Sequence, residues 1–562
     1  MVAFGLACSL AACRDRARPA SLSAATTPVV MTELALDGMP EERATVGLVD
    51  DAESLADVVA SIDAIGRDPA RRGLFLRIGP LGRGFARAEE LASALGRLRA
   101  VHEPVHCHFD VADNLAYYVM ARGCDRIAMT PAGHLATVGV SAHLYSVHGL
   151  LEWAGIRAEF SQAGSDKGAQ DPFVLDEPSP GHRASVTSLV EALQARLAEP
   201  IVARGGATSF AEAPFDSDRA KERHLIDAIE FDDEARERAR RAAGATRVVP
   251  RSRTSPPRSI GELAERLLAS REEDAVDRPH IVVAYLTGPI VDGGASSSSS
   301  TAADPFVDAM RRFARAPNVR AVVLRIDSPG GSALASDRMW HSVARLSRSK
   351  PVIVSVGDMA ASGGYYVAVA GSAILAEPSS IVGSIGVVAG RPDLGPVLER
   401  FGVRFTPIVG APSADVFTPF RGLRPDERVR FDASIQAAYA RFVDRVHTGR
   451  RIEASAVAAT EGGVYTGARA RDLGLVDALG GLDDALARAR RDARLPDDAP
   501  FVVWPQATSF LESLLGGGTE EVSAAPLDRI DPALGRMLAA TAIALEGAPF
   551  PRAALPYGLE IR

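Results

Sequence analysis

The stretch Gly357-Asp358-Met359-Ala360-Ala361-Ser362-Gly363-Gly364-Tyr365-Tyr366 decides the fold of this chain. The apolar run 351–356 before it is typical of a buried strand, and the residues from Tyr366 onward are typical of a helix start. A turn of small residues between a strand and a helix places its side chains at the edge of a sheet, beside the free backbone N–H groups of the helix. Ser362 is therefore either an activated hydroxyl beside an oxyanion site or a simple helix cap.

The composition is that of an ordinary globular protein. The chain has 562 residues, too many for a single core, so at least two domains are expected. The formal net charge is −8 and the folded part carries no basic block, which argues against nucleic-acid binding. The sequence has no run of about 18 or more apolar residues, as an ordinary membrane-spanning helix would need. Beyond the N-terminal region the cysteines are Cys107 and Cys124, and this pair permits a disulfide without requiring one.

The N-terminal region carries a possible export signal. Leu10-Ala11-Ala12-Cys13 is typical of a bacterial lipoprotein cleavage site, although no basic segment precedes it. We expect residues 1–13 to be the signal, Cys13 to be lipidated and 14–30 to be an unstructured tether. The protein would then be anchored by its lipid to a membrane of the bacterial cell envelope, on the periplasmic side. The alternative is a disordered N-terminal tail.

Strand-like and helix-like segments alternate along both halves of the chain. This alternation predicts βαβ units with parallel strands, and so an α/β fold. The main expected strands are 73–78, 104–109, 281–286 and 321–326, and the main expected helices are 55–65, 89–98, 115–121, 306–314 and 337–346.

The two halves also repeat each other. Leu76-Arg77-Ile78 recurs as Leu324-Arg325-Ile326, and Tyr117-Tyr118 recurs as Tyr365-Tyr366, in both cases after about 250 residues. A nearly constant offset across several elements indicates an internal duplication. We therefore expect two tandem domains, with a linker and helix between them and an extension of unknown role after them. The predicted ranges are 31–244, 245–279, 280–495 and 496–562 in that order.

The duplication separates two reactive residues. Ser362 aligns with Asn114 in the first half, and Lys167 aligns with Ala414 in the second half. Each half thus has one of the two groups and lacks the other. Together they form a complete pair, because a neutral amine can take the hydroxyl proton while the oxygen attacks a carbonyl group.

Such a lysine must be neutral to act as a base. Its pKa would have to fall from ~10.4 to about 7 or 8, and burial is the simplest cause. The Gly/Ala-rich segment 164–169 around Lys167 favours burial, although Asp166 would oppose the shift if it pointed the same way. Taken alone, Lys167 would be interpreted as a solvated surface residue.

An oxyanion site needs two backbone donors. The N–H of Gly363, directly after the candidate nucleophile, is the first. The second is expected in the turn 327–332, at the carboxyl end of a strand, where ligands of parallel sheets gather. We assign it to the N–H of Gly331.

Four motifs together resemble the signal peptide peptidase A family, also called protease IV, in its long duplicated form. They are Ser-Pro-Gly-Gly at 328–331, Asp-Met-Ala-Ala-Ser-Gly-Gly-Tyr-Tyr at 358–366, Val-Gly-Ser-Ile-Gly-Val at 382–387, and Tyr-Thr-Gly-Ala-Arg-Ala-Arg-Asp-Leu-Gly-Leu-Val-Asp at 465–477. The resemblance runs from about residue 45 to 490. It implies two Clp/crotonase-like domains and a serine–lysine dyad of Ser362 and Lys167. Ser384 would orient the lysine, and no metal or cofactor is expected.

The resemblance also implies a bowl-shaped homotetramer that degrades hydrophobic signal peptides left in the membrane after secretion. Ser362 and Lys167 lie in different domains, so they can meet either between the two halves of one chain or between neighbouring chains, and the resemblance favours neighbouring chains. The chain departs from the family in two respects. Its start resembles that of a lipoprotein instead of a membrane helix, and its lysine lies in Asp166-Lys167-Gly168 where the family usually has Tyr-Lys-Ser.

Two other interpretations remain open. A Clp-type Ser-His-Asp peptidase would need a histidine after the nucleophile helix, and the segment 381–388 has none. His341 and His447 are more simply explained as surface or packing residues. The second alternative is a catalytically inactive or acyl-CoA-binding crotonase-like protein, which the fold alone permits.

Overall fold

The computed structural model describes residues 29–43, 53–101, 103–206, 210–251, 278–294 and 300–505, and the short strands 552–554 and 560–561. Cys13, the expected signal and nearly all of the expected tether lie outside these residues, as does most of the expected linker. Within the part described, no helix is both long enough and apolar enough to cross a membrane.

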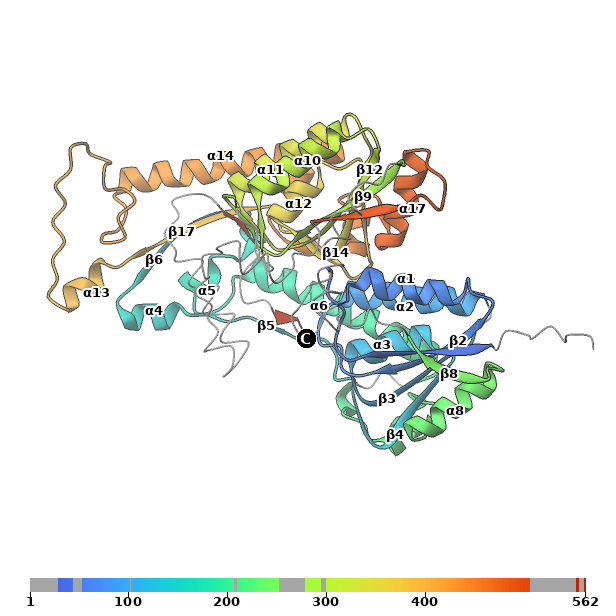
Figure 1. The fold of residues 1–562 in the computed structure, drawn as a ribbon. Helices are drawn as coiled ribbons and strands as arrows, with labels where there is room; N and C mark the ends of the chain where they lie inside the picture. The colour runs from blue at the N-terminus through green and yellow to red at the C-terminus, as the bar shows by residue number, and fades with distance from the viewer. Residues whose placement is uncertain are drawn as a thin grey trace, which may run out of the picture.

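The first domain is a parallel sheet with helices on both faces (Figure 1). Its strands lie in the order β7-β4-β3-β2-β1-β8, with α1, α2 and α3 on one face and α8 on the other. The elements of this half are β1 (Val30–Leu36), α1 (Leu55–Ile65), β2 (Arg71–Ile78), α2 (Phe85–Ala100), β3 (Val105–Asp113), α3 (Asn114–Gly123), β4 (Arg126–Ala136), β5 (Ala142–His143), α4 (His148–Ala154), β6 (Arg157–Ala163), the 3-10 turn η1 (Ser165–Lys167), α5 (Asp171–Val174), α6 (Pro180–Ala203), η2 (Phe210–Glu212), α7 (Ser217–Glu222), β7 (Ala228–Ile229), α8 (Asp232–Ala242) and β8 (Arg247–Pro250).

The second domain repeats this plan. Its main sheet has the order β18-β16-β14-β12-β9-β20, and β9, β12, β14 and β16 are parallel. The elements are β9 (His280–Thr287), β10 (Ile290–Val291), β11 (Thr301–Ala302), α10 (Ala303–Arg315), β12 (Val319–Ser328), β13 (Gly330–Ser332), α11 (Ala333–Ser347), β14 (Val352–Ala361), α12 (Gly363–Ala368), β15 (Ala373–Ala376), β16 (Ile381–Gly383), β17 (Val387–Asp393), α13 (Gly395–Arg400), α14 (Pro425–Arg450), α15 (Ala454–Ala458), β18 (Val464–Thr466), α16 (Gly467–Asp472), β19 (Ala478–Leu479), α17 (Leu482–Asp492), β20 (Phe501–Trp504), β21 (Arg552–Ala554) and β22 (Glu560–Ile561).

The central strand β14 shows why the sheet forms where it does. Its residues Val352, Val354 and Val356 pack under α10 to α12, while Ile353 faces the opposite side with α17. A strand buried on both faces is a continuous apolar run, as expected for a parallel sheet covered by helices.

The duplication is visible in matching hydrogen bonds. The Tyr117 hydroxyl on α3 donates to the carbonyl of Leu225 at 2.6 Å, and the Tyr365 hydroxyl on α12 donates to the carbonyl of Leu475 at 2.8 Å. Each bond ties the helix that follows the third parallel strand to the same later segment of its domain. The expectation of two tandem domains from an internal duplication is confirmed. The first sheet reaches Pro250 through β8, and β20 adds residues 501–504 to the second sheet, so both domains extend beyond the ranges expected from the sequence.

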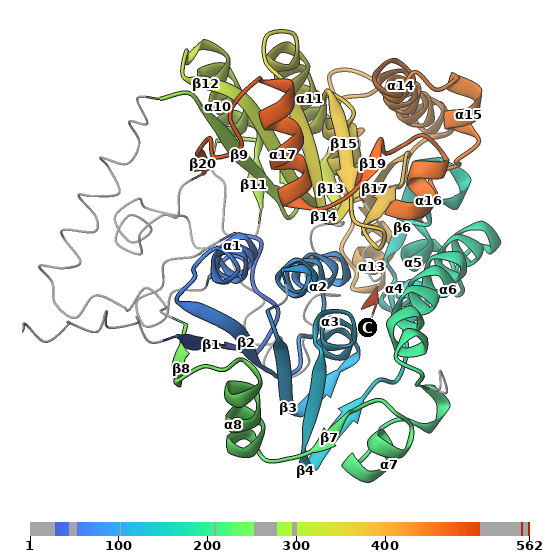
Figure 2. The same cartoon turned by 90° about the vertical axis from the view of Figure 1, so that its right-hand side faces the viewer.

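The two domains pack through α1 and α2, which lie between the two sheets (Figure 2). The Arg87 guanidinium on α2 donates to the carboxylate of Asp358 at 2.6 Å. Arg325 on β12 is fully buried and pairs with Glu42 at 2.7 Å and with Glu90 at 2.6 Å, both from the first domain. These contacts fix the orientation of the first domain against the strands that lead to Ser362.

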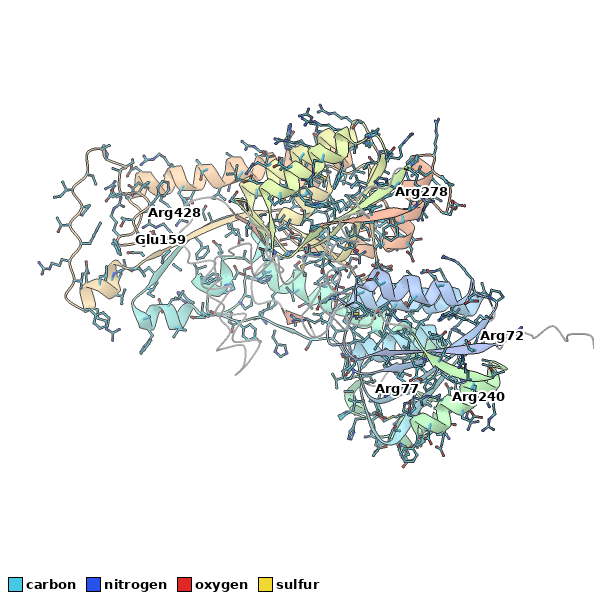
Figure 3. All side chains as sticks on the ribbon, viewed as in Figure 1. Arg72, Arg77, Glu159, Arg240, Arg278 and Arg428 are labelled. Atoms are coloured by element: carbon cyan, nitrogen blue, oxygen red, sulfur yellow. A yellow bond between two sulfur atoms is a disulfide. The ribbon has the colours of Figure 1, made fainter. Side chains whose placement is uncertain are left out.

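A second contact between the halves is a strand pair. β6 of the first half runs antiparallel to β17 of the second half, with Ala163 opposite Val387 and Arg157 opposite Asp393. Around Glu159 and Arg428, both labelled in Figure 3, this ribbon is tied to α14, because Arg428 donates to the carbonyl of Phe160 at 2.6 Å. The residues after β6 are therefore held beside the residues before β17.

Candidate active site

Ser362 lies where β14 ends and α12 begins. The strand continues through 357–361, which we expected to be a turn, so the whole change of direction falls on Ser362. Its backbone has φ 52° and ψ −115°, a strained conformation that often marks functional sites. The side chain is fully buried and makes no capping bond to α12, so helix capping does not explain this serine.

Lys167 reaches Ser362 from the other half of the chain. It ends the short turn η1, four residues after β6, and its Nζ atom lies 2.9 Å from Ser362 Oγ. The pairing of β6 with β17 explains this meeting, because it brings η1 next to the end of β16 and to the loop that holds Ser384. We expected the dyad to be shared between neighbouring chains, and this is wrong: one chain supplies both side chains.

The lysine is buried with little access to water. Burial lowers the pKa of the Lys167 amine to about 7. The neighbouring Asp166 does not oppose this shift, because its carboxylate lies against Gly181 and accepts a bond from the Ser165 hydroxyl at 3.1 Å. A substantial fraction of the amine is therefore neutral near pH 7.

Ser384 completes the surroundings of the amine. Lys167 Nζ donates to the backbone carbonyl of Ser384 and to its hydroxyl, each at 3.1 Å. A neutral amine has two N–H groups and one lone pair. When both N–H groups are directed to Ser384, the lone pair is left for the O–H of Ser362. The geometry therefore suits proton transfer from the serine to the lysine.

The two expected oxyanion donors follow the carboxyl ends of two neighbouring parallel strands, β14 for Gly363 and β12 for Gly331. Gly363 is the first residue of α12, so its N–H has no acceptor within the helix. The helix start packs closely on the end of β12, since a Cβ atom at Gly364 would lie 2.8 Å from the carbonyl oxygen of Ser328. Gly331 follows on β13 with φ 155°, and a side chain there would strike the carbonyl of Ile290. Only glycine fits this position.

The histidines expected as alternatives lie elsewhere. His341 is exposed on α11, and Nδ1 of His447 lies 2.6 Å from the carbonyl oxygen of Ile452. Among the described residues, Lys167 is the one side chain within hydrogen-bond distance of Ser362 Oγ. A Ser-His-Asp arrangement is therefore absent from the described part of this site.

Sequence reasoning missed two glycines that make room for the lysine. A Cβ atom at Gly386 would lie 2.8 Å from Cδ of Lys167, and one at Gly462 would lie 2.9 Å from its Cβ.

Sequence reasoning also missed Asp327, which directly precedes the Ser-Pro-Gly-Gly turn and accepts a bond from the Met359 N–H at 3.1 Å. Burial, followed by the nearby carboxylates of Asp358 and Glu42, raises the pKa of Asp327 to about 8.

The chain is similar to several known proteins. The model of peptidase family S49 matches residues 98–246 and 344–496, more than half of the chain and one range in each half. The chain is 28% identical to a chloroplastic serine protease SPPA of Arabidopsis thaliana, over 76% of this chain and 64% of that protein. It is 26% identical to Protease 4 of Salmonella typhi, over 84% of this chain and 79% of that protein. It thus spans less than two thirds of the Arabidopsis protein.

Among solved structures, the chain is similar to a ClpP1 protein of Listeria monocytogenes at 13% identity, with a TM-score of 0.24, over 40% of this chain and 99% of that one. The match of one family model to both halves agrees with the expected pair of Clp/crotonase-like domains. Because this family model matches more than half of the chain, with one range in each half, the chain belongs to peptidase family S49.

Proposed function

We propose that the protein is a serine endopeptidase in which Ser362 is the nucleophile and Lys167 is the general base. The observation that carries this proposal is the 2.9 Å separation of Lys167 Nζ from Ser362 Oγ inside a buried site. A crotonase-like acyl-CoA binder or an inactive scaffold would have no need for a buried neutral amine beside a strained serine. The substrates we propose are hydrophobic peptides, including cleaved signal peptides.

The reaction follows from these groups. Lys167 Nζ takes the proton of Ser362 Oγ while the oxygen attacks the carbonyl carbon of the scissile bond. The negative charge on the carbonyl oxygen is stabilised by the N–H groups of Gly363 and Gly331. The Lys167 ammonium then gives its proton to the leaving amine. A water molecule repeats the sequence on the acyl-enzyme and restores Ser362, and Ser384 keeps the amine in place throughout.

We further propose that the protein works in the bacterial cell envelope, anchored through a lipid on Cys13. A disulfide joins Cys107 on β3 to Cys124 after α3, with Cα atoms 6.0 Å apart in the core of the first domain. Disulfides of this kind persist in oxidising compartments such as the periplasm. The pairing therefore supports a location on the periplasmic side.

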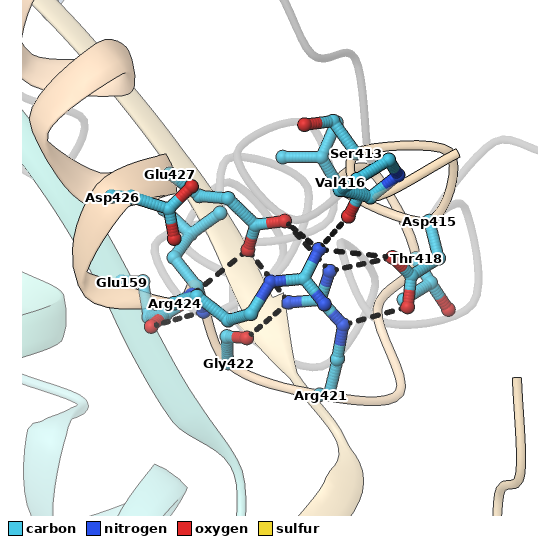
Figure 4. Close-up of polar contacts among 12 residues, drawn as sticks. Glu159, Ser413, Asp415, Val416, Thr418, Arg421, Gly422, Arg424, Asp426 and Glu427 are labelled. Carbon is cyan, nitrogen blue, oxygen red and sulfur yellow. Dashed lines mark hydrogen bonds and ion pairs between the residues drawn. The ribbon is translucent and has the colours of Figure 1, made fainter. Parts of the chain in front are cut away.

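Assembly into a homotetramer is proposed as well. The segment 401–424 after α13 projects from one end of the molecule (Figure 1) and carries exposed apolar side chains, including Phe401, Phe417 and Ile408, the last fully exposed. Figure 4 shows that this segment is fixed by ion pairs: Arg421 bridges Asp415 and Glu427 with four bonds of 2.8–2.9 Å. An ordered apolar projection of this kind supports contact with another subunit.

The pH dependence of the reaction follows from the lysine. Because only the neutral amine can accept the serine proton, kcat/KM should rise with pH through about 7 and level off above it. The ammonium form, which predominates below that value, is inactive. The measurement is the pH profile of kcat/KM on an uncharged apolar peptide with a fluorogenic scissile bond. A profile that is flat from about pH 6 to 10 would count against a titrating Lys167.

The function itself is tested by labelling and hydrolysis. A fluorophosphonate probe should modify Ser362 in the wild-type protein, and the purified protein should cleave a hydrophobic peptide. Ser362→Ala should abolish both signals. If the probe labels another residue, or if Ser362→Ala retains the hydrolysis rate of the wild type, the proposal is wrong.

A further inference from the structure

The strand β21 lies in a slot beside the candidate active site. The second sheet of this domain has the order β11-β10-β13-β21-β17-β6, so β21 separates β13 from β17. It is antiparallel to both, with Gly331 opposite Ala553, and with Arg552 opposite both Ser332 and Val388. Without β21, the edges of β13 and β17 would face each other across two strand spacings, about 10 Å. That opening is one extended strand wide.

The walls of this slot belong to the catalytic machinery. β13 carries Gly331, the proposed oxyanion donor, and β17 begins three residues after Ser384. β21 also contacts α12, the helix that begins directly after Ser362. A peptide lying in the slot therefore passes the nucleophile. Pairing through the main chain also makes few demands on sequence, which suits an enzyme that takes diverse peptides.

The same segment is attached at a second point. β22 pairs antiparallel with β5 of the first domain, Glu560 opposite His143 and Ile561 opposite Ala142. Residues 552–554 thus pair with strands of the second domain, and residues 560–561 pair with a strand of the first. Both pairings are short, three residues for β21 on β13 and two residues for β22 on β5, so we expect the attachment to be reversible.

We propose that residues 552–554 are an intramolecular competitor that occupies the peptide-binding slot between β13 and β17 and must leave before a substrate strand can bind. This proposal rests on the proposed peptidase function and adds its regulation. A tethered segment acts at an effective concentration on the order of 1 mM. If its affinity for the slot is about 0.1 mM, it reduces the apparent affinity for substrate about tenfold.

The proposal is tested with three forms of the protein. One chain ends at Pro505 and lacks both strands, and a second is the full chain with Ala553→Pro, which removes an N–H and distorts the strand. The third is the full chain with Ala553→Ser, which keeps the backbone N–H and is the matched control. We expect KM for a hydrophobic peptide to fall about tenfold in the first two, with kcat little changed, and to stay at the wild-type value in the third.

A peptide-binding measurement distinguishes failure of this proposal from failure of the proposed peptidase function. In a Ser362→Ala background, a fluorescein-labelled hydrophobic peptide should bind about tenfold more tightly when the chain ends at Pro505, and a synthetic peptide of residues 550–557 should compete with it. This readout needs no catalysis, so an inactive wild type would refute the function and leave the slot testable. Equal KM and equal peptide affinity with and without residues 506–562, or in Ala553→Pro, would overturn the proposal. If the chain that ends at Pro505 does not fold, the full-length Ala553→Pro variant tests the proposal.

Discussion

Replacing Lys167 by methionine is expected to lower kcat/KM by roughly 10²- to 10⁴-fold, the usual contribution of a positioned general base. Methionine has a similar length and no proton acceptor, so Ser362 keeps its buried position but loses the amine 2.9 Å from its Oγ. Arginine should be no better, since a guanidinium stays protonated at every working pH. The measurement is kcat/KM on a hydrophobic peptide, together with the melting temperature to show that the variant is folded.

Two further variants make this test specific. Lys350→Ala removes a partly buried lysine whose Nζ donates to the carbonyl of Phe313 at 2.6 Å, away from Ser362, and it should leave kcat/KM unchanged. Ser384→Ala should cost less than the loss of Lys167, because the amine keeps the carbonyl of Ser384 as a partner at 3.1 Å. A Lys167→Met enzyme within tenfold of the wild type would mean that another group accepts the serine proton.

The elements of the fold could be predicted because each depends on local pattern. The expected helix at 55–65 is α1 with the same bounds, and the strand expected at 321–326 lies inside β12. The repeat then located the candidate site, because Ser362 and Lys167 each lack a counterpart in the other half. When each half of a duplicated chain keeps one reactive residue and lacks the other, the pair can be recognised from a single sequence without an alignment.

The geometry of the dyad could not be predicted in the same way. It depends on β6 pairing with β17, and the register between residues 157–163 and 387–393 leaves no trace in the local hydrophobic pattern of either strand. Sequence reasoning therefore placed the two halves of the site in different chains. Gly386 and Gly462 were overlooked for a related reason: their role is to make room for the stem of Lys167, which the sequence does not place beside them.

The arginine of the repeated Leu-Arg-Ile motif is exposed in one domain and buried in the other. Arg77 on β2, labelled in Figure 3, is about half exposed and pairs with Asp232 at 3.2 Å on the outer face of the first sheet. Arg325 holds the equivalent place on β12 but is fully buried, because the first domain covers that face of the second sheet. The sequence gives both arginines the same alternation with apolar neighbours. Only the packing of one domain on the other distinguishes them.

This difference predicts a large effect on stability. Arg325→Met removes the cation between Glu42 and Glu90, and breaking a buried ion pair in this way is expected to reduce the free energy of unfolding by about 3 to 5 kcal/mol. Arg77→Met, the matched substitution in the first half, removes a half-exposed pair and should cost about 1 kcal/mol or less. The measurement is urea unfolding of both variants and the wild type at pH 8.

The loss in Arg325→Met should also depend on pH. Burial raises the pKa of Glu90, and Arg325 partly offsets this effect. Without the arginine, the folded protein holds a proton on Glu90 more tightly than the unfolded chain does, so the penalty is greatest at neutral and alkaline pH and shrinks as pH falls toward about 4 to 5. Adding Glu90→Gln to Arg325→Met should recover part of the loss at pH 8, because it removes one of the two unpaired carboxylates. If Arg325→Met costs no more than Arg77→Met, or costs the same at pH 5 as at pH 8, then Arg325 does not hold the domains together through its charge.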